Sequence, residues 1–148
     1  MSAKRIALAG SAAFLVMFVL GGLWNAVVMS GFYAAQAPGN ARPPEEASLL
    51  FIAVGYVLLA FFMAFLYTQS FSARPSAGQS FQFGALFGVI ATLPLYLILY
   101  GVWDISILHV LVDSGWHLIE QGVGGLTLGL VLFSPKKAPA TALKNEVS

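Results

Sequence analysis

Four long apolar stretches alternate with short polar segments along the chain. Each is close to or above the ~20 residues that a helix needs to cross a hydrocarbon core of ~30 Å. Because helices satisfy their backbone hydrogen bonds internally, this pattern predicts an all-α membrane protein, a bundle of four transmembrane helices. The predicted spans cover residues 6–29, 47–67, 81–103 and 115–133.

The segments between the spans are rich in proline, glycine and polar residues. The sequence GFYAAQAPGNARPPEEAS after the first span has the composition of a solvated loop. Residues 105–113 could form an interfacial helix or continue into the fourth span, and Gly115 is the expected break or kink point. The polar tail 134–148 is expected to be mobile. We expect residues 1–148 to form a single integral membrane domain.

The composition agrees with a membrane protein and excludes several other classes. Hydrophobic residues make up 59% of the chain and charged residues 9%, against about 25% charged in soluble proteins. The net charge is +1, and the basic residues are too scattered to predict nucleic-acid binding. The absence of cysteine excludes disulfides, thiolate metal sites and cysteine nucleophiles.

The basic residues predict the orientation in the lipid bilayer. If there are four spans, six of the seven lie on one side and only Arg42 lies on the other. Cytoplasmic segments carry an excess of lysine and arginine, so both termini are expected in the cytoplasm. The predicted location is a cell membrane, specifically a bacterial inner membrane, with several crossings. The six residues on the cytoplasmic side are Lys4, Arg5, Arg74, Lys136, Lys137 and Lys144.

Polar side chains form a stripe on the last predicted helix. At 100° per residue, His109, Asp113, His117 and Glu120 fall within about 80° of one another. A charged side chain costs ~3 kcal/mol at the bilayer centre, so the stripe should face the protein interior. Counted along each predicted span, further polar residues lie at the same depth in the outer half of the bilayer. The candidate ligand-binding residues are His117, Glu120, Asp113, Asn25 and Tyr100.

This polar level has two interpretations. The groups could satisfy one another as interhelical contacts, with Glu120 bonded to Asn25 or a tyrosine. Alternatively, they could line a pocket or water-filled cleft that opens outward, for example for a quinone-like head group beside Tyr100.

Metal binding and catalysis have weaker support from the sequence. His117, Glu120 and Asp113 are close enough on a helix to share a metal ion. They lack the additional glutamates that di-iron bundles use, so no cofactor follows from the residues alone. Ser114, His117 and Asp113 lie within about one turn and cannot adopt the geometry of a hydrolase triad, so no catalytic residue is predicted.

Two pairs of glycines indicate close helix packing. Gly84 and Gly88 lie four residues apart on the third span, as do Gly125 and Gly129 on the fourth. Such pairs let two helix backbones approach closely. They predict packing of the third span on the fourth, and they also offer faces for self-association or for other membrane subunits.

Two functions are consistent with these features. The favoured one is a non-enzymatic accessory or structural subunit of a membrane complex, because four small helices offer few catalytic groups. The alternative is a membrane protein or enzyme that binds a small ligand, a quinone or a metal through the outer pocket on the fourth helix.

Overall fold

A computed structural model describes residues 1–36, 42–43 and 46–134. Within these residues the chain is all-α, with no strands. The predicted mobile tail lies, except for Ser134, outside the described residues. The elements in chain order are α1 (Ala3–Leu23), the π-helical turn η1 (Trp24–Val28), α2 (Ser30–Gln36), α3 (Leu49–Ser70), α4 (Ala77–Val102) and α5 (Ile107–Leu132).

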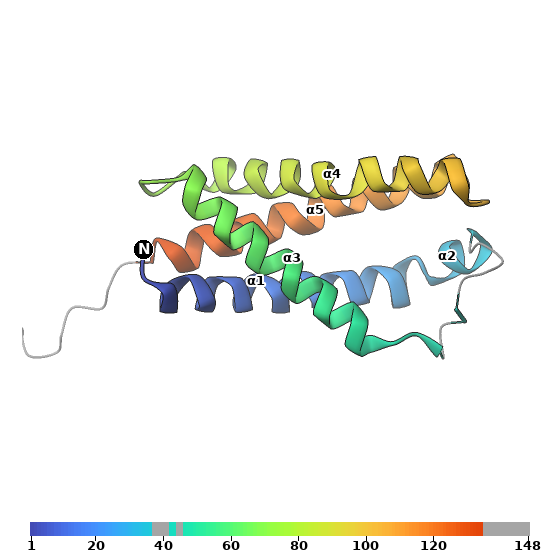
Figure 1. Cartoon of the computed structure of the whole chain (residues 1–148), viewed down its shortest axis with the longest axis horizontal. Helices are drawn as coiled ribbons and strands as arrows, with labels where there is room; N and C mark the ends of the chain where they lie inside the picture. Colours follow the sequence, from blue (N-terminus) through green and yellow to red (C-terminus); the bar gives the residue numbers. More distant parts are fainter. Residues whose placement is uncertain (37–41, 44–45, 135–148) are drawn as a thin grey trace, which may run out of the picture.

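Helix α5 lies at the centre of the arrangement. It runs antiparallel to α4 and packs against α1 on its other side (Figure 1). Helix α3 crosses α1 obliquely and makes few contacts with α4. Groups on α5 can therefore be reached by side chains from several other helices.

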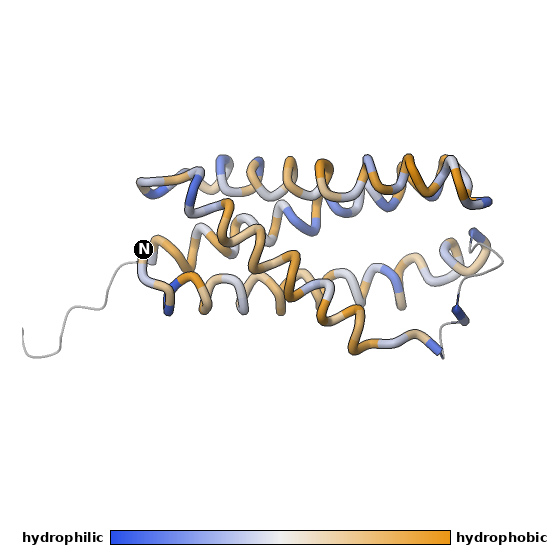
Figure 2. The backbone as a smooth tube through the Cα atoms, viewed as in Figure 1, coloured by the Kyte–Doolittle hydropathy of each residue, from blue (hydrophilic) through white to orange (hydrophobic). Residues whose placement is uncertain are grey.

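Three of the described helices are long and apolar enough to cross a membrane. They cover Ala3–Val28, Leu49–Ser70 and Ala77–Val102. Helix α5 has the same length as α4 but is not among them. Figure 2 shows the reason, because hydrophilic residues interrupt the apolar colour in the middle of α5. Composition and length thus support three of the four predicted spans.

The start of α5 differs from the expectation. The helix runs without a break from Ile107 through Gly115, so the expected break at Gly115 is wrong, and the alternative of a helix that continues into the fourth predicted span is confirmed from Ile107 onward. The Ser106 hydroxyl accepts a hydrogen bond of 3.0 Å from the His109 backbone N–H and caps the first turn. A Cβ at Gly115 would have no neighbour within 4 Å, so no close contact requires glycine here. Its effect on the helix is its low helix propensity, which costs about 1 kcal/mol relative to alanine.

The segment after the first span also differs from the expectation. Residues 30–36 form α2, although the sequence predicted a loop from residue 31 onward. The Tyr33 N–H donates to the Met29 carbonyl at 2.9 Å, which continues helical bonding beyond η1. The remainder of the predicted loop includes residues 37–41 and 44–45, which lie outside the described residues. The folded part of this segment places Tyr33 beside α5.

Small residues bring the backbones of α4 and α5 into contact. A Cβ on Gly125 would overlap the Ser80 carbonyl oxygen and would lie 3.0 Å from the Gly84 backbone nitrogen. A Cβ on Gly88 would overlap the His117 carbonyl oxygen. These three glycines thus lie in a contact between helices of the same chain. The contact extends along α5 as far as His117, which fixes the position of that residue.

The fully buried core lies where α1, α3 and α5 meet. It consists mainly of alanine and methionine, which let the helices pack closely, and its largest side chain is Tyr67. The Tyr67 and Ser80 hydroxyl groups are 2.7 Å apart and connect α3 to α4. The residues of this core are Ala9, Ala13, Met17, Ala60, Met63, Ala64, Tyr67, Leu128 and Leu132.

Candidate functional site

Three ionisable side chains on consecutive turns of α5 form the centre of the site. His117 Nε2 lies 3.4 Å from an Asp113 carboxyl oxygen, and His117 Nδ1 lies 2.9 Å from Glu120 Oε2. The separations of four and three residues place all three side chains on one helix face. Both ring nitrogens therefore face an acid, and the imidazolium is the form that donates from both. We call these residues the acid–histidine triad.

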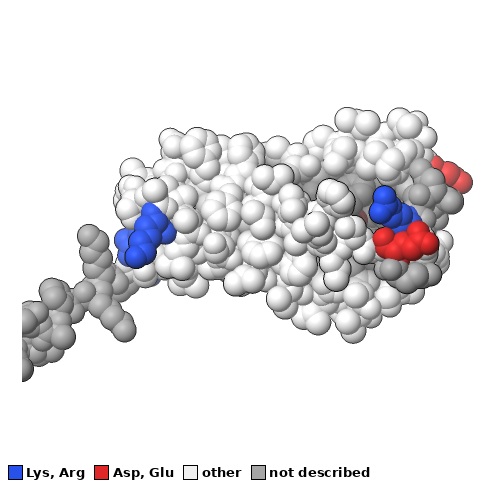
Figure 3. All heavy atoms as spheres, turned by 60° about the horizontal axis from the view of Figure 1, so that its bottom comes forward, with Lys and Arg blue, Asp and Glu red and all other residues white. Residues whose placement is uncertain are grey.

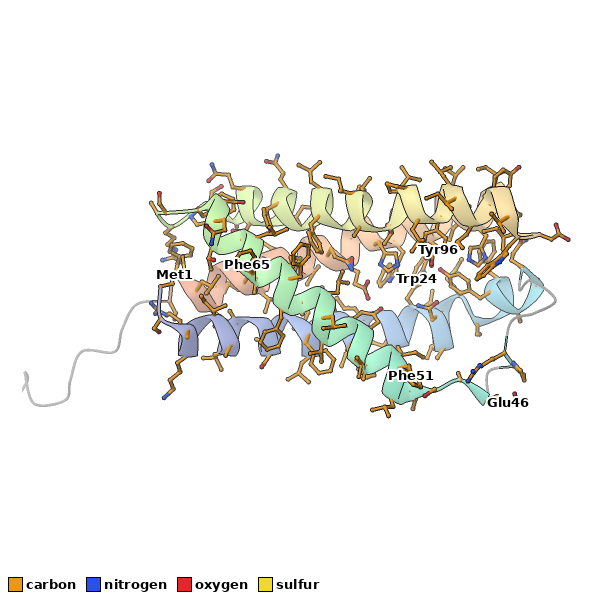
Figure 4. The ribbon with its side chains drawn as sticks, viewed as in Figure 1. Met1, Trp24, Glu46, Phe51, Phe65 and Tyr96 are labelled. Atoms are coloured by element: carbon orange, nitrogen blue, oxygen red, sulfur yellow. The ribbon has the colours of Figure 1, made fainter. Side chains whose placement is uncertain are left out.

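Tyrosines from two other helices hold the two acids. The Tyr33 hydroxyl on α2 donates to Asp113 Oδ1 at 2.6 Å, and the Tyr56 hydroxyl on α3 donates to Glu120 Oε1 at 2.8 Å. Trp24 Nε1 in η1 donates in turn to the Tyr33 hydroxyl at 2.9 Å. A continuous chain of polar contacts thus runs from η1 and α2 through α5 to α3. Figure 4 shows Trp24 and Tyr96 pointing into the space between α4 and α1 where these groups meet.

The triad is almost completely enclosed. Glu120 is 0% exposed and Asp113 is 5% exposed, while the His117 side chain is 18% exposed. Burying an acid costs free energy unless it is paired and hydrogen-bonded. Here, Glu120 has a partner for each of its oxygens. This pairing explains how α5 tolerates an acid in an apolar surrounding.

Aromatic rings surround the outer part of the triad. The rings of Trp24 and Trp116 stack in parallel, with centroids 4.3 Å apart. The ring of His109 packs edge to face on Tyr33 at 5.4 Å, so this member of the polar stripe contacts aromatic rings. This aromatic packing holds Tyr33, which bonds to Asp113, and Trp24, which bonds to Tyr33.

A π-helical turn shapes the wall next to Glu120. In η1, the Met29 N–H donates to the Trp24 carbonyl five residues back, at 2.8 Å. The Asn25 side-chain N–H donates to the Gly21 carbonyl at 3.0 Å. Single π turns inside α-helices occur frequently at functional sites. In this chain the turn carries Trp24, which bonds to Tyr33, and Asn25, which lines the cavity described next.

A cavity opens between α1, η1 and the N-terminal part of α3, and Tyr56 lies on its wall. Its volume is about 490 Å³, within the range of ~300–1,000 Å³ that is usual for ligand pockets. Most of its wall is apolar, and Tyr56 and Asn25 supply its polar side chains. We call it the α1–α3 cavity. Its lining residues are Phe18, Gly21, Gly22, Asn25, Ala26, Ala47, Leu49, Ile52 and Tyr56.

The structure brings together three of the five candidate ligand-binding residues. Asp113, His117 and Glu120 form the triad. Asn25 is exposed and bonds to its own helix, although it lines the α1–α3 cavity. Tyr100 is 46% exposed and contributes no side-chain hydrogen bond to the triad. The part of the chain that the structure describes contains no group of three or more histidines and acids arranged to hold a metal ion.

Tyr33 and Tyr56 were missed by the sequence analysis. Tyr33 lies in the segment that was predicted to be a loop, and no feature of its sequence indicates a contact with Asp113. Tyr56 carries a hydroxyl in the middle of an otherwise apolar span, and this hydroxyl could have been matched to Glu120 by depth. Comparisons with protein-family models, curated proteins and solved structures find no match for this chain.

Gly21→Ala should separate Tyr56 from Glu120. A Cβ on Gly21 would overlap the Tyr56 hydroxyl and would lie 2.6 Å from Glu120 Oε1. We expect a loss of about 1–3 kcal/mol in unfolding free energy, the cost of a buried polar group without its partner. Gly22→Ala is the matched control, because a Cβ there meets nothing within 4 Å. Detergent melting curves that show equal shifts for both variants would contradict this geometry.

Proposed function

We propose that this chain is a four-span membrane protein with both termini in the cytoplasm, and that it binds a small amphipathic ligand in the α1–α3 cavity. One observation carries the proposal: Tyr56 lies on the cavity wall and donates a hydrogen bond to the fully buried Glu120. Ligand pockets are typically apolar with a few well-placed polar groups, and this cavity has that composition. The triad would then determine the charge and the hydrogen bonding at the polar end of the cavity through Glu120 and Tyr56.

The packing of α5 supports its assignment as the fourth span. Its polar side chains Asp113, Glu120 and Gln121 are buried inside the protein. Polar residues in membrane helices nearly always face the protein interior, so low mean hydropathy does not argue against insertion here. Figure 3 shows charged residues at the two ends of the visible face and uncharged surface between them.

The topology is tested by reporter fusions. A reporter fused after Ser148 should be active in the cytoplasm, because an even number of spans returns the chain to its starting side. A reporter inserted between Arg42 and Pro43 should be active only on the outer side. Finding both reporters on the same side would rule out this topology.

Ligand binding is tested by native mass spectrometry of the protein extracted in a mild detergent. The wild-type chain should carry a ligand in about 1:1 ratio. Tyr56→Phe should reduce its occupancy, because the phenyl ring keeps the packing and removes only the hydroxyl. Tyr100→Phe is the matched control on the exposed surface of α4 and should retain the ligand. A chain that extracts only with other membrane subunits and carries no ligand would instead support the accessory-subunit function.

A further inference from the structure

Hydrogen bonding at the polar end of the α1–α3 cavity is directional. The Tyr56 proton is committed to Glu120 Oε1, so its oxygen can offer only lone pairs to a ligand. Asn25 uses one N–H on the Gly21 carbonyl, which orients its amide and leaves its side-chain oxygen as an acceptor and its second N–H as a donor. Tyr56 therefore favours a ligand that donates a hydrogen bond.

The charge behind Tyr56 favours a cation. The triad contains two carboxyl groups and one imidazole, so acidic groups exceed basic groups. Within the described residues, the ion pairs of Asp113 and Glu120 involve only His117, and no lysine or arginine compensates the second acid. Glu120 Oε1 lies 2.8 Å from the Tyr56 oxygen. Charges interact far more strongly at low dielectric than in water, so a cation beside Tyr56 would be attracted and an anion repelled.

Aromatic rings and apolar walls provide for the rest of such a ligand. The rings of Phe18 and Tyr56 meet edge to face, with centroids 5.7 Å apart, and both residues line the cavity. Aromatic faces attract ammonium groups within about 6 Å. Leu49 and Ile52 form an apolar wall at the N-terminal end of α3.

From these three features we infer that the ligand of the α1–α3 cavity is a cationic amphiphile, with a primary ammonium head group at Tyr56 and an apolar tail along α3. This inference rests on the proposed ligand-binding function. It adds the chemical class of the head group, which the existence of a cavity alone does not specify.

The test compares four probes with the same tail on the unmodified protein in zwitterionic nanodiscs. Dodecylamine, dodecanol, 2-dodecanone and dodecanoate are titrated, and saturable binding is measured by calorimetry. Dodecylamine should bind in 1:1 ratio and at least about tenfold more tightly than dodecanol, because dodecanol donates a hydrogen bond without a charge. The ketone should bind more weakly still, and dodecanoate should show no saturable binding.

Two variants connect the preference to the site. Glu120→Gln keeps the shape of the side chain and removes the charge, so it should reduce the preference for dodecylamine over dodecanol to about twofold or less. Tyr100→Phe, on the exposed surface of α4, should leave the preference unchanged. Melting temperatures of both variants show whether they are folded. If a variant does not fold, the ranking of the four probes on the wild-type protein still tests the inference.

The outcomes separate the two proposals. Equal or tighter binding of dodecanol, 2-dodecanone or dodecanoate would overturn the cationic head group and leave the ligand-binding function standing. The same conclusion follows if no probe binds but native mass spectrometry finds a ligand that depends on Tyr56. If no probe binds and no ligand is found, the proposed function itself fails.

Discussion

Glu120→Leu should lower the unfolding free energy by about 3–5 kcal/mol, the usual cost of removing one partner of a buried ion pair. Leucine offers no hydrogen bond to Tyr56 or to His117, which would both remain in an apolar surrounding. The loss would loosen the connection of α5 to α3. Unfolding in mixed detergent and denaturant, followed by circular dichroism, measures the change.

Glu120→Gln separates the hydrogen bonds from the charge. The amide oxygen keeps an acceptor for Tyr56, and the amide N–H can donate to His117 Nδ1 once the imidazole is neutral and carries its proton on Nε2, so we expect a loss of no more than about 1.5 kcal/mol. Ile119→Leu is the control, because Ile119 is the exposed neighbour of Glu120. If the Gln variant unfolds as readily as the Leu variant, the carboxylate charge itself holds the helices together.

Gly125→Ala should destabilise the contact between α4 and α5 by about 1–3 kcal/mol or more. The new Cβ would overlap the Ser80 carbonyl oxygen and would lie within 3.1 Å of the backbone nitrogen and Cα of Gly84. These are backbone atoms of α4, so they cannot move aside by a change of rotamer. The two helices would have to separate along their closest approach.

Gly115→Ala is the matched control for this prediction. Gly115 lies on the same helix, is exposed, and has no neighbour within 4 Å of an added Cβ. Its replacement should not destabilise the protein and should stabilise the helix by up to about 1 kcal/mol, because alanine has the higher helix propensity. Gly84→Ala and Gly125→Ala disrupt the same contact, so their effects should not add in the double variant. Full additivity would contradict a single shared contact.

Both predictions concern α5, which combines low mean hydropathy with extensive burial. Its glycines permit contact with α4, and that contact places the triad between the other helices. The polar residues that keep α5 from appearing as an apolar span are the same residues that its neighbours enclose. Mean hydropathy alone therefore does not identify α5 as part of the bundle, whereas the burial of its polar residues accounts for its place between the other helices.

The sequence by itself determined the all-α class, three of the helices apolar enough to cross a membrane, and the grouping of Asp113, His117 and Glu120. Apolar length and helical periodicity are local properties, so residues three or four apart on a helix lie side by side whatever surrounds them. Only the tertiary structure decided that Tyr33 and Tyr56 hold the acids, that α5 continues through Gly115, and that a cavity opens beside η1. These features depend on which helix faces meet, and contacts between residues 64 or 80 positions apart leave no spacing in the sequence from which they could be predicted.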